Sequence, residues 1–84
     1  MKTVDLDLGR FRLARAVEDR RTALKLPQGE AARRVGRPQQ WWSLRERGGR
    51  EISAPALVAF AAALETTPHK LLEAAGLWPV GQKT

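Results

Sequence analysis

The sequence predicts one all-α domain made of five helices that are joined by short loops. Three observations support this fold class. Apolar residues recur at the spacing of an amphipathic helix along most of the chain. Residues that favour helix starts precede these segments, and glycine or proline follows them. The chain of 84 residues is also long enough to bury a single small core.

The first predicted helix covers about residues 8–25, with Leu13 and Val17 on its apolar face. Pro27 ends this helix, because the residue before a proline is driven out of the α region. Residues 1–7 alternate apolar and acidic side chains over too short a stretch to distinguish a frayed arm from an extended segment.

The centre of the chain contains two short helical patterns, at about 28–35 and 38–47, with Gly36 between them. Pro38 suits the first turn of the second helix, because its missing N–H would have no helical partner there. Gly48 is a natural C-terminal stop. Two short helices, a tight turn that contains glycine and a basic second helix together are a helix-turn-helix signature.

Two more helices follow a glycine-containing loop. Ser53 is the predicted N-cap of the fourth helix, which ends near Leu64. Thr67 and Pro68 begin the fifth helix, and Gly76 ends it. The resulting organisation is an N-terminal arm, a helix-turn-helix domain and a C-terminal tail, over residues 1–7, 8–77 and 78–84.

Positive charge is concentrated in one half of the chain. Residues 10–50 contain twelve Arg and Lys against four carboxylates, a net charge of +8, whereas residues 53–84 are neutral. This layout is expected for a protein with a polyanionic partner, although many basic surfaces are only solvated. Arg outnumbers Lys, and Arg is better suited to bidentate contacts with phosphate and guanine.

Several function classes find no support in the sequence. The chain has no window of about 18 apolar residues and no apolar signal region, so we expect a cytoplasmic protein. With no Cys and only His69, the chain has neither a hydrolytic triad nor a set of metal ligands. We therefore expect no enzyme activity, no metal and no cofactor.

The helix-turn-helix pattern resembles the Cro/C1-type (XRE) family over roughly residues 8–77. Arg45 departs from this pattern, because the family usually has an apolar residue there. The residues that carry the resemblance are Gln28, Ala32, Gly36, Trp42, Ser43, the Glu46–Gly48 end of the third helix, the Leu57, Ala61 and Leu64 stripe, and the start of the fifth helix at Thr67.

The resemblance implies a lambda repressor-like fold, in which the third helix enters the major groove of DNA. Gln can bond adenine N6 and N7 together, but two exposed Gln residues can also be simple helix formers. Leu44 offers a methyl contact for thymine, or else belongs to the core. The implied base contacts are Arg37, Gln39, Gln40, Ser43 and Leu44.

The side chains that flank the presumed groove are better candidates for phosphates than for base edges. Trp41 and Trp42 lie about 100° apart on a helix, so both cannot face inward, and we expect Trp42 in the core. Glu46 is expected to brace the third helix against a nearby Arg. The implied phosphate contacts are Gln28, Arg33, Arg34, Trp41, Arg47 and Arg50.

The sequence thus predicts a small, bacterial or phage-encoded transcriptional regulator, such as a repressor, a Cro-like protein or a controller protein. A single short recognition helix gives little specificity, so we expect a homodimer on a palindromic double-stranded operator. Leu77 and Trp78 are the candidate dimer contacts, or alternatively a cap on the core. The alternative function is an antitoxin-type module that uses the same fold to bind a protein partner.

Overall fold

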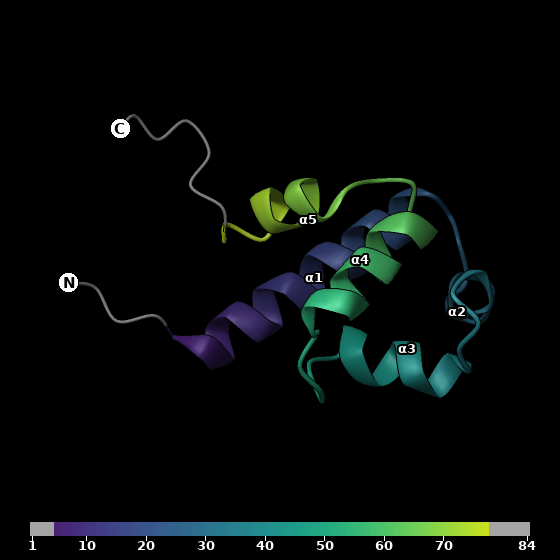
Figure 1. Cartoon of the computed structure of the whole chain (residues 1–84), viewed down its shortest axis with the longest axis horizontal. Helices are drawn as coiled ribbons and strands as arrows, with labels where there is room; N and C mark the ends of the chain where they lie inside the picture. Colours follow the sequence, from purple (N-terminus) through teal and green to yellow (C-terminus); the bar gives the residue numbers. More distant parts are fainter. Residues whose placement is uncertain (1–4, 78–84) are drawn as a thin grey trace.

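The computed structural model describes residues 5–77 and confirms the all-α prediction, with five helices in this part of the chain. Figure 1 shows α3 and α5 on opposite sides of α4, while α1 contacts both α3 and α5. The helices are α1 (Leu6–Ala23), α2 (Gln28–Arg34), α3 (Gln39–Glu46), α4 (Ala54–Ala63) and α5 (Pro68–Ala74).

Helix α1 begins two residues earlier than predicted, so part of the expected arm is helical. The reason is a side-chain cap, since Asp5 Oδ1 accepts the backbone N–H of Leu8 at 3.0 Å. The helix ends at Ala23 and is followed by Lys25 in a left-handed conformation, with a φ of 55°. The chain then turns before Pro27, as predicted.

The turn between α2 and α3 depends on Gly36, which has a φ of 69°. This left-handed conformation favours glycine, because a Cβ would crowd the backbone. Pro38 is the N-cap residue of α3 and has extended backbone angles, so it precedes the first helical turn instead of opening it. The prediction for the start of α3 was therefore early by one residue.

Helices α4 and α5 start at the predicted caps. The hydroxyl of Ser53 accepts the N–H of Ala56, and that of Thr67 accepts the N–H of Lys70. The last carbonyls of a helix have no partner within the helix. At the end of α4, Arg20 donates to the carbonyl oxygens of Leu64 and Glu65 at 2.9 and 3.0 Å.

The core is built around Trp42 of α3, which is completely buried, as predicted. The edge of its indole meets the ring of Phe60 of α4, with the centroids 4.4 Å apart. Trp41 stacks on the same ring, with the centroids 5.3 Å apart, and remains partly exposed. Ala31 and Ala32 are fully buried, and such small residues let α2 approach its neighbours closely.

Glu46, the last residue of α3, is the buried acid that joins three helices. Its carboxylate accepts two hydrogen bonds from the Arg21 guanidinium of α1, each 2.8 Å long. It also accepts one from the side-chain amide of Gln28 in α2 and one from the Trp42 indole, at 2.8 and 2.7 Å. The predicted brace between Glu46 and an Arg is confirmed, and we call these four side chains the Glu46 cluster.

The Glu46 cluster keeps its acid charged. Burial raises the pKa of Glu46, but the hydrogen bonds from Arg21, Gln28 and Trp42, together with the charge of Arg21, outweigh burial and lower it below its ordinary value of 4.5. The hydrogen bond to Glu46 in turn raises the pKa of Arg21. The two charges are therefore present together in the folded protein.

Replacing Glu46 tests how strongly the cluster holds the helices. In Glu46→Gln the Arg21 guanidinium stays largely buried but loses the carboxylate that neutralises it. We therefore expect the free energy of unfolding to fall by about 3–5 kcal/mol. Urea unfolding at neutral pH measures this loss. The control is Glu30→Gln on the exposed side of α2, with an expected change of about 0.5 kcal/mol or less. Equal losses in the two variants would contradict the assignment.

The lowered pKa of Glu46 also predicts a pH dependence. The folded state binds this proton less readily than the unfolded state, so the stabilisation is present above the ordinary pKa and is lost as the pH falls through the folded value. Urea unfolding of wild type and Glu46→Gln from pH 7 to about pH 3 should therefore show their stability difference shrinking below pH 4.5. A constant difference over this range would be the contrary result.

Candidate nucleic-acid interface

The outer face of α3 is defined by the residues that point away from the core. Gln40 and Leu44 each lie two positions from Trp42 or Glu46, which places them about 200° around the helix from those buried side chains. Gln40 is exposed and Leu44 is half-buried. These two side chains occupy the centre of the surface that α3 presents to solvent.

Leu44 does not join the hydrophobic core, so the core role that was one of its two predicted roles is wrong. It lies over Gly49, where a Cβ would come within 2.7 Å of its Cδ1 atom. A side chain at that position would require Leu44 to shift.

The other predicted base-contact residues lie around this centre. Gln39 is exposed, and its Oε1 atom lies 3.3 Å from the position of a Cβ on Gly29 of α2, so the side chain follows the start of α2. Arg37 is exposed in the turn before α3, and Ser43 is half-buried. Arg37, Gln39 and Gln40 therefore lie at the N-terminal end of α3. Ser43 and Leu44 lie one turn further along the helix.

The end of α3 is shaped by Gly48 and Phe11. Gly48 has a φ of 80°, and a Cβ there would overlap the ring of Phe11 from α1. The ring thus covers the end of α3 and fixes the path of the following loop. Arg47 and Arg50, both exposed, leave the helix from this point. The role of Phe11 depends on tertiary contact, and the sequence pattern gave no sign of it.

Five arginines lie on α3 or on the segments next to it in the chain. Arg33 comes from α2, Arg37 from the turn, Arg45 from α3, and Arg47 and Arg50 from the residues that follow α3. Within residues 5–77 none of these five has a carboxylate at ion-pair distance. Their charges therefore remain available to an external anion, whereas Glu46 is neutralised inside the protein.

A hollow of about 360 Å³ lies between α3 and α4, and Trp41 forms one wall. The Arg45 guanidinium carbon lies 4.3 Å from the centre of the Trp41 ring, and that of Arg37 lies 5.8 Å away. Burial, followed by the positive charges of Arg50 and Arg37, lowers the pKa of Arg45. An anion in this hollow would reduce the repulsion between the three guanidinium groups.

Arg45 is a candidate anion contact that the sequence-based set omitted. The family usually has an apolar residue at this position, so the sequence predicted no anion contact for Arg45. A signal was nevertheless present, because Trp41 and Arg45 are four residues apart on one side of the third helix and Arg37 precedes Trp41 by another four residues. The structure confirms this spacing and places the three side chains around one hollow.

Two residues expected at phosphates make contacts within the protein. The amide N–H of Gln28 donates to Glu46, so it is not directed at an external anion. Arg34 donates to the carbonyl of Ala63 at 2.8 Å and meets the Glu65 carboxylate at 3.2 Å, which ties α2 to the end of α4. The predicted dimer residue Trp78 lies outside the described residues.

Comparison with known proteins places the chain in a family. A family described as helix-turn-helix domain matches residues 12–74, which is most of the chain. The crystal structure of the clp gene regulator ClgR from C. glutamicum is similar, with a TM-score of 0.78 and 24% sequence identity, covering 88% of this chain and 96% of that one. No curated protein sequence matches. Over residues 5–77 no helix has both the length and the apolar character needed to cross a membrane. This chain belongs to the helix-turn-helix domain family, as the pattern of residues 28–48 predicted.

Proposed function

We propose that the protein is a Cro/C1-type transcription regulator that reads double-stranded DNA by inserting α3 into the major groove. The observation that carries this proposal is the outer face of α3. It combines Gln40 and Leu44 at its centre with unpaired arginines at its borders. A duplex presents base edges at the centre of its major groove and phosphates along both sides, so the two surfaces are complementary.

The base contacts are assigned from position on α3. Gln40 and Leu44 lie at the centre of the outer face, where a Gln amide can bond adenine and a Leu methyl group can contact thymine. Gln39 and Arg37 lie towards the N-terminal end of α3, which leads into the groove in this fold. Ser43 is half-buried and lies at the margin of the set.

The phosphate contacts are assigned to the unpaired arginines. Arg33 borders α3 from α2, and Arg47 and Arg50 border it from the loop. We add Arg45, because it shares the hollow beside Trp41 with Arg37. Trp41 then acts by supporting these two guanidinium groups through its ring. Gln28 and Arg34 position α2 through their contacts with Glu46 and with the end of α4.

A homodimer is part of the proposal, and its surface involves Leu77. A hollow of about 260 Å³ lies between the start of α1 and the loop before α4, and both Leu6 and Leu77 line it. Leu6 is 78% exposed although it lies on the same face of α1 as the buried Leu13. A second copy would cover Leu6, which extends the buried apolar face of α1. The dimer would then present a second α3 to the adjacent half-site of a palindromic operator.

Regulation of transcription, by repression in the simplest case, is the role that fits a small sequence-specific DNA-binding domain. The fold is shared with a solved protein described as a gene regulator, which supports this assignment. The proposal includes no catalytic step. An antitoxin-type role would require a protein partner in addition to DNA.

Base readout predicts that Gln40→Ala loses sequence preference. Each good bidentate contact discriminates by about 1–3 kcal/mol, so the preference for a duplex selected from a random pool should fall about 5- to 150-fold. Fluorescence anisotropy against the selected and a shuffled duplex measures this ratio. Affinity for the shuffled duplex should stay the same, and an unchanged ratio would argue against readout by Gln40.

Phosphate contact predicts a change in salt dependence for Arg45→Ala. Loss of one neutralised phosphate should reduce the slope of log affinity against log salt by about 0.9, with similar weakening on all sequences. Titrations at several salt concentrations give the slope. Arg15→Ala removes the same charge from an exposed position on α1 and serves as the control. Indistinguishable slopes for the two variants would remove Arg45 from the interface.

The dimer predicts a concentration-dependent mass in sedimentation velocity experiments. Leu6→Asp introduces a charge at the apolar surface and should shift the protein to monomer. Val58→Asp is the matched control, because Val58 is also an exposed apolar residue but lies on α4, away from this surface. A wild-type protein that stays monomeric with the selected duplex present would contradict the proposed dimer.

A further inference from the structure

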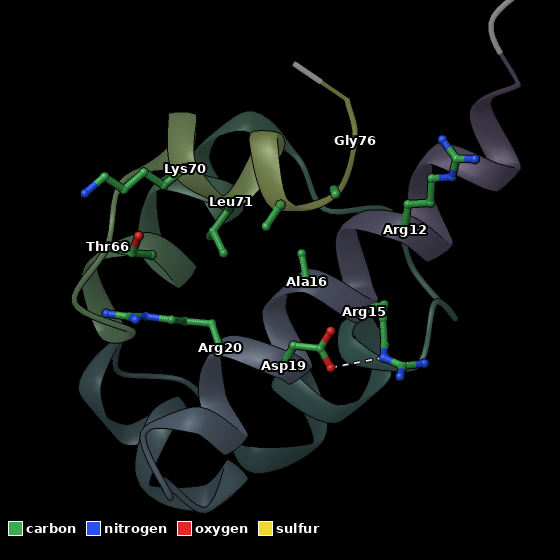
Figure 2. A pocket seen from close by; sticks show the side chains of 11 residues that line it. Arg12, Arg15, Ala16, Asp19, Arg20, Thr66, Lys70, Leu71 and Gly76 are labelled. Atoms are coloured by element: carbon green, nitrogen blue, oxygen red, sulfur yellow. Dashed lines mark hydrogen bonds and ion pairs between the residues drawn. The ribbon is translucent and has the colours of Figure 1, made fainter. Parts of the chain in front are cut away.

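Helices α1 and α5 enclose a groove of about 630 Å³ that the proposed DNA interface does not use. Figure 2 shows Ala16 of α1 and Leu71 of α5 facing each other across it. Ala75 also lines the groove, and all three residues are buried against the core, so they form an apolar floor. Figure 1 shows α5 on the opposite side of α4 from α3.

Basic side chains surround this floor, as Figure 2 shows. The residues that line the groove include Arg12, Arg15, Arg20 and Lys70 but only one acid, Asp19, which gives a net charge of +3. Asp19 is paired with Arg15 at 3.0 Å. Arg20 donates to the neutral carbonyl oxygens of Leu64 and Glu65, and within residues 5–77 it has no carboxylate at ion-pair distance.

The two ends of the groove carry its free cations. Figure 2 places Arg12 and Lys70 at opposite ends, one beside Gly76 and the other beside Thr66. In the part of the chain that the structure describes, neither Arg12 nor Lys70 has a carboxylate at ion-pair distance. The groove therefore offers an apolar strip with an unpaired positive charge at each end.

We propose that this groove docks an acidic, amphipathic segment of a partner protein. Apolar side chains of the segment would pack on the exposed Ala74 and against the edges of Leu71 and Ala75, and its carboxylates would meet Arg12 and Lys70. A nucleic acid offers phosphates for the rim but no apolar side chain for the floor. A second copy of this chain is assigned to the hollow lined by Leu6 and Leu77, where Asp5 and Glu51 offset Arg10, and not to this basic groove. Charge complementarity thus points to an acidic protein segment.

The groove faces away from α3, so the partner and DNA can bind at the same time. This surface would let a DNA-bound regulator recruit, or respond to, a second protein. The inference does not depend on DNA binding, because docking is measured without any duplex present. Failure of the proposed function and failure of this inference therefore give different results.

The probe is a fluorescein-labelled peptide of roughly 14 residues, about four helical turns, in which Leu forms one face and Glu the other. The control peptide has the same composition, but its Leu residues are scattered so that no apolar face exists. Fluorescence anisotropy with the full chain, at physiological salt, measures both affinities. We expect the amphipathic peptide to bind and the scrambled peptide to bind at least about tenfold more weakly, since it cannot cover the floor.

The variants compare two lysines outside the proposed DNA interface. Lys70→Glu reverses a charge at the groove, and we expect about five- to tenfold weaker peptide binding. Lys25→Glu reverses the same charge on the exposed turn after α1, away from the groove, and should leave the affinity unchanged. Amide chemical shifts in the wild-type chain should move most at Ala16, Leu71 and Ala75 when the peptide is added.

Four results of the binding and chemical-shift experiments would overturn the inference. These are no binding of the amphipathic peptide, equal binding of the scrambled peptide, equal weakening by Lys25→Glu and Lys70→Glu, and shift changes confined to α3. The second and third would show that net charge alone attracts the peptide. Displacement of the peptide from the groove residues by duplex DNA would assign the groove to nucleic acid, and displacement by self-association would assign it to a second copy. Both displacement results count against an acidic protein segment.

Discussion

The arrangement of the helix-turn-helix depends on one buried carboxylate. Glu46 accepts hydrogen bonds from Arg21, Gln28 and Trp42, which belong to α1, α2 and α3. Only 4% of its side chain is exposed, and 13% of that of Arg21. Two charges with so little solvent are stable only when every donor and acceptor is satisfied, so the three helices must keep their relative positions. The angle between α2 and α3 is therefore fixed by a polar cluster as well as by packing.

The same cluster determines the electrostatics of the outer surface. Because Glu46 is turned inward, the outer face of α3 carries no carboxylate, and the arginines around it stay unpaired. Arginine thus has two separate uses in this chain. Arg20, Arg21 and Arg34 donate to internal carbonyl or carboxylate oxygens, whereas Arg37 and Arg50 project from the surface. Net charge alone could not separate these two sets, since both contribute equally to it.

Local sequence signals were sufficient for most of the fold. Ser53, Thr67 and Gly36 act through contacts or backbone angles within a few residues, so their roles could be predicted. The contacts of Gln28 with Glu46 and of the exposed Arg34 with Ala63 could not, because these partners lie 18 and 29 residues away. The α1–α5 groove is also formed by residues far apart in the sequence, which explains why no local pattern indicated it.

The proposed function requires that α3 lies in the major groove of DNA. The Glu46 cluster holds α3 in the orientation that allows this. Methylation protection with dimethyl sulfate tests this directly, because the reagent modifies guanine N7 in the major groove and adenine N3 in the minor groove. On a duplex selected from a random pool, we predict that bound protein protects guanine N7 atoms at the recognised bases and leaves adenine N3 atoms reactive. Protection of adenine N3 without protection of guanine N7 within the bound site would contradict the insertion of α3 into the major groove.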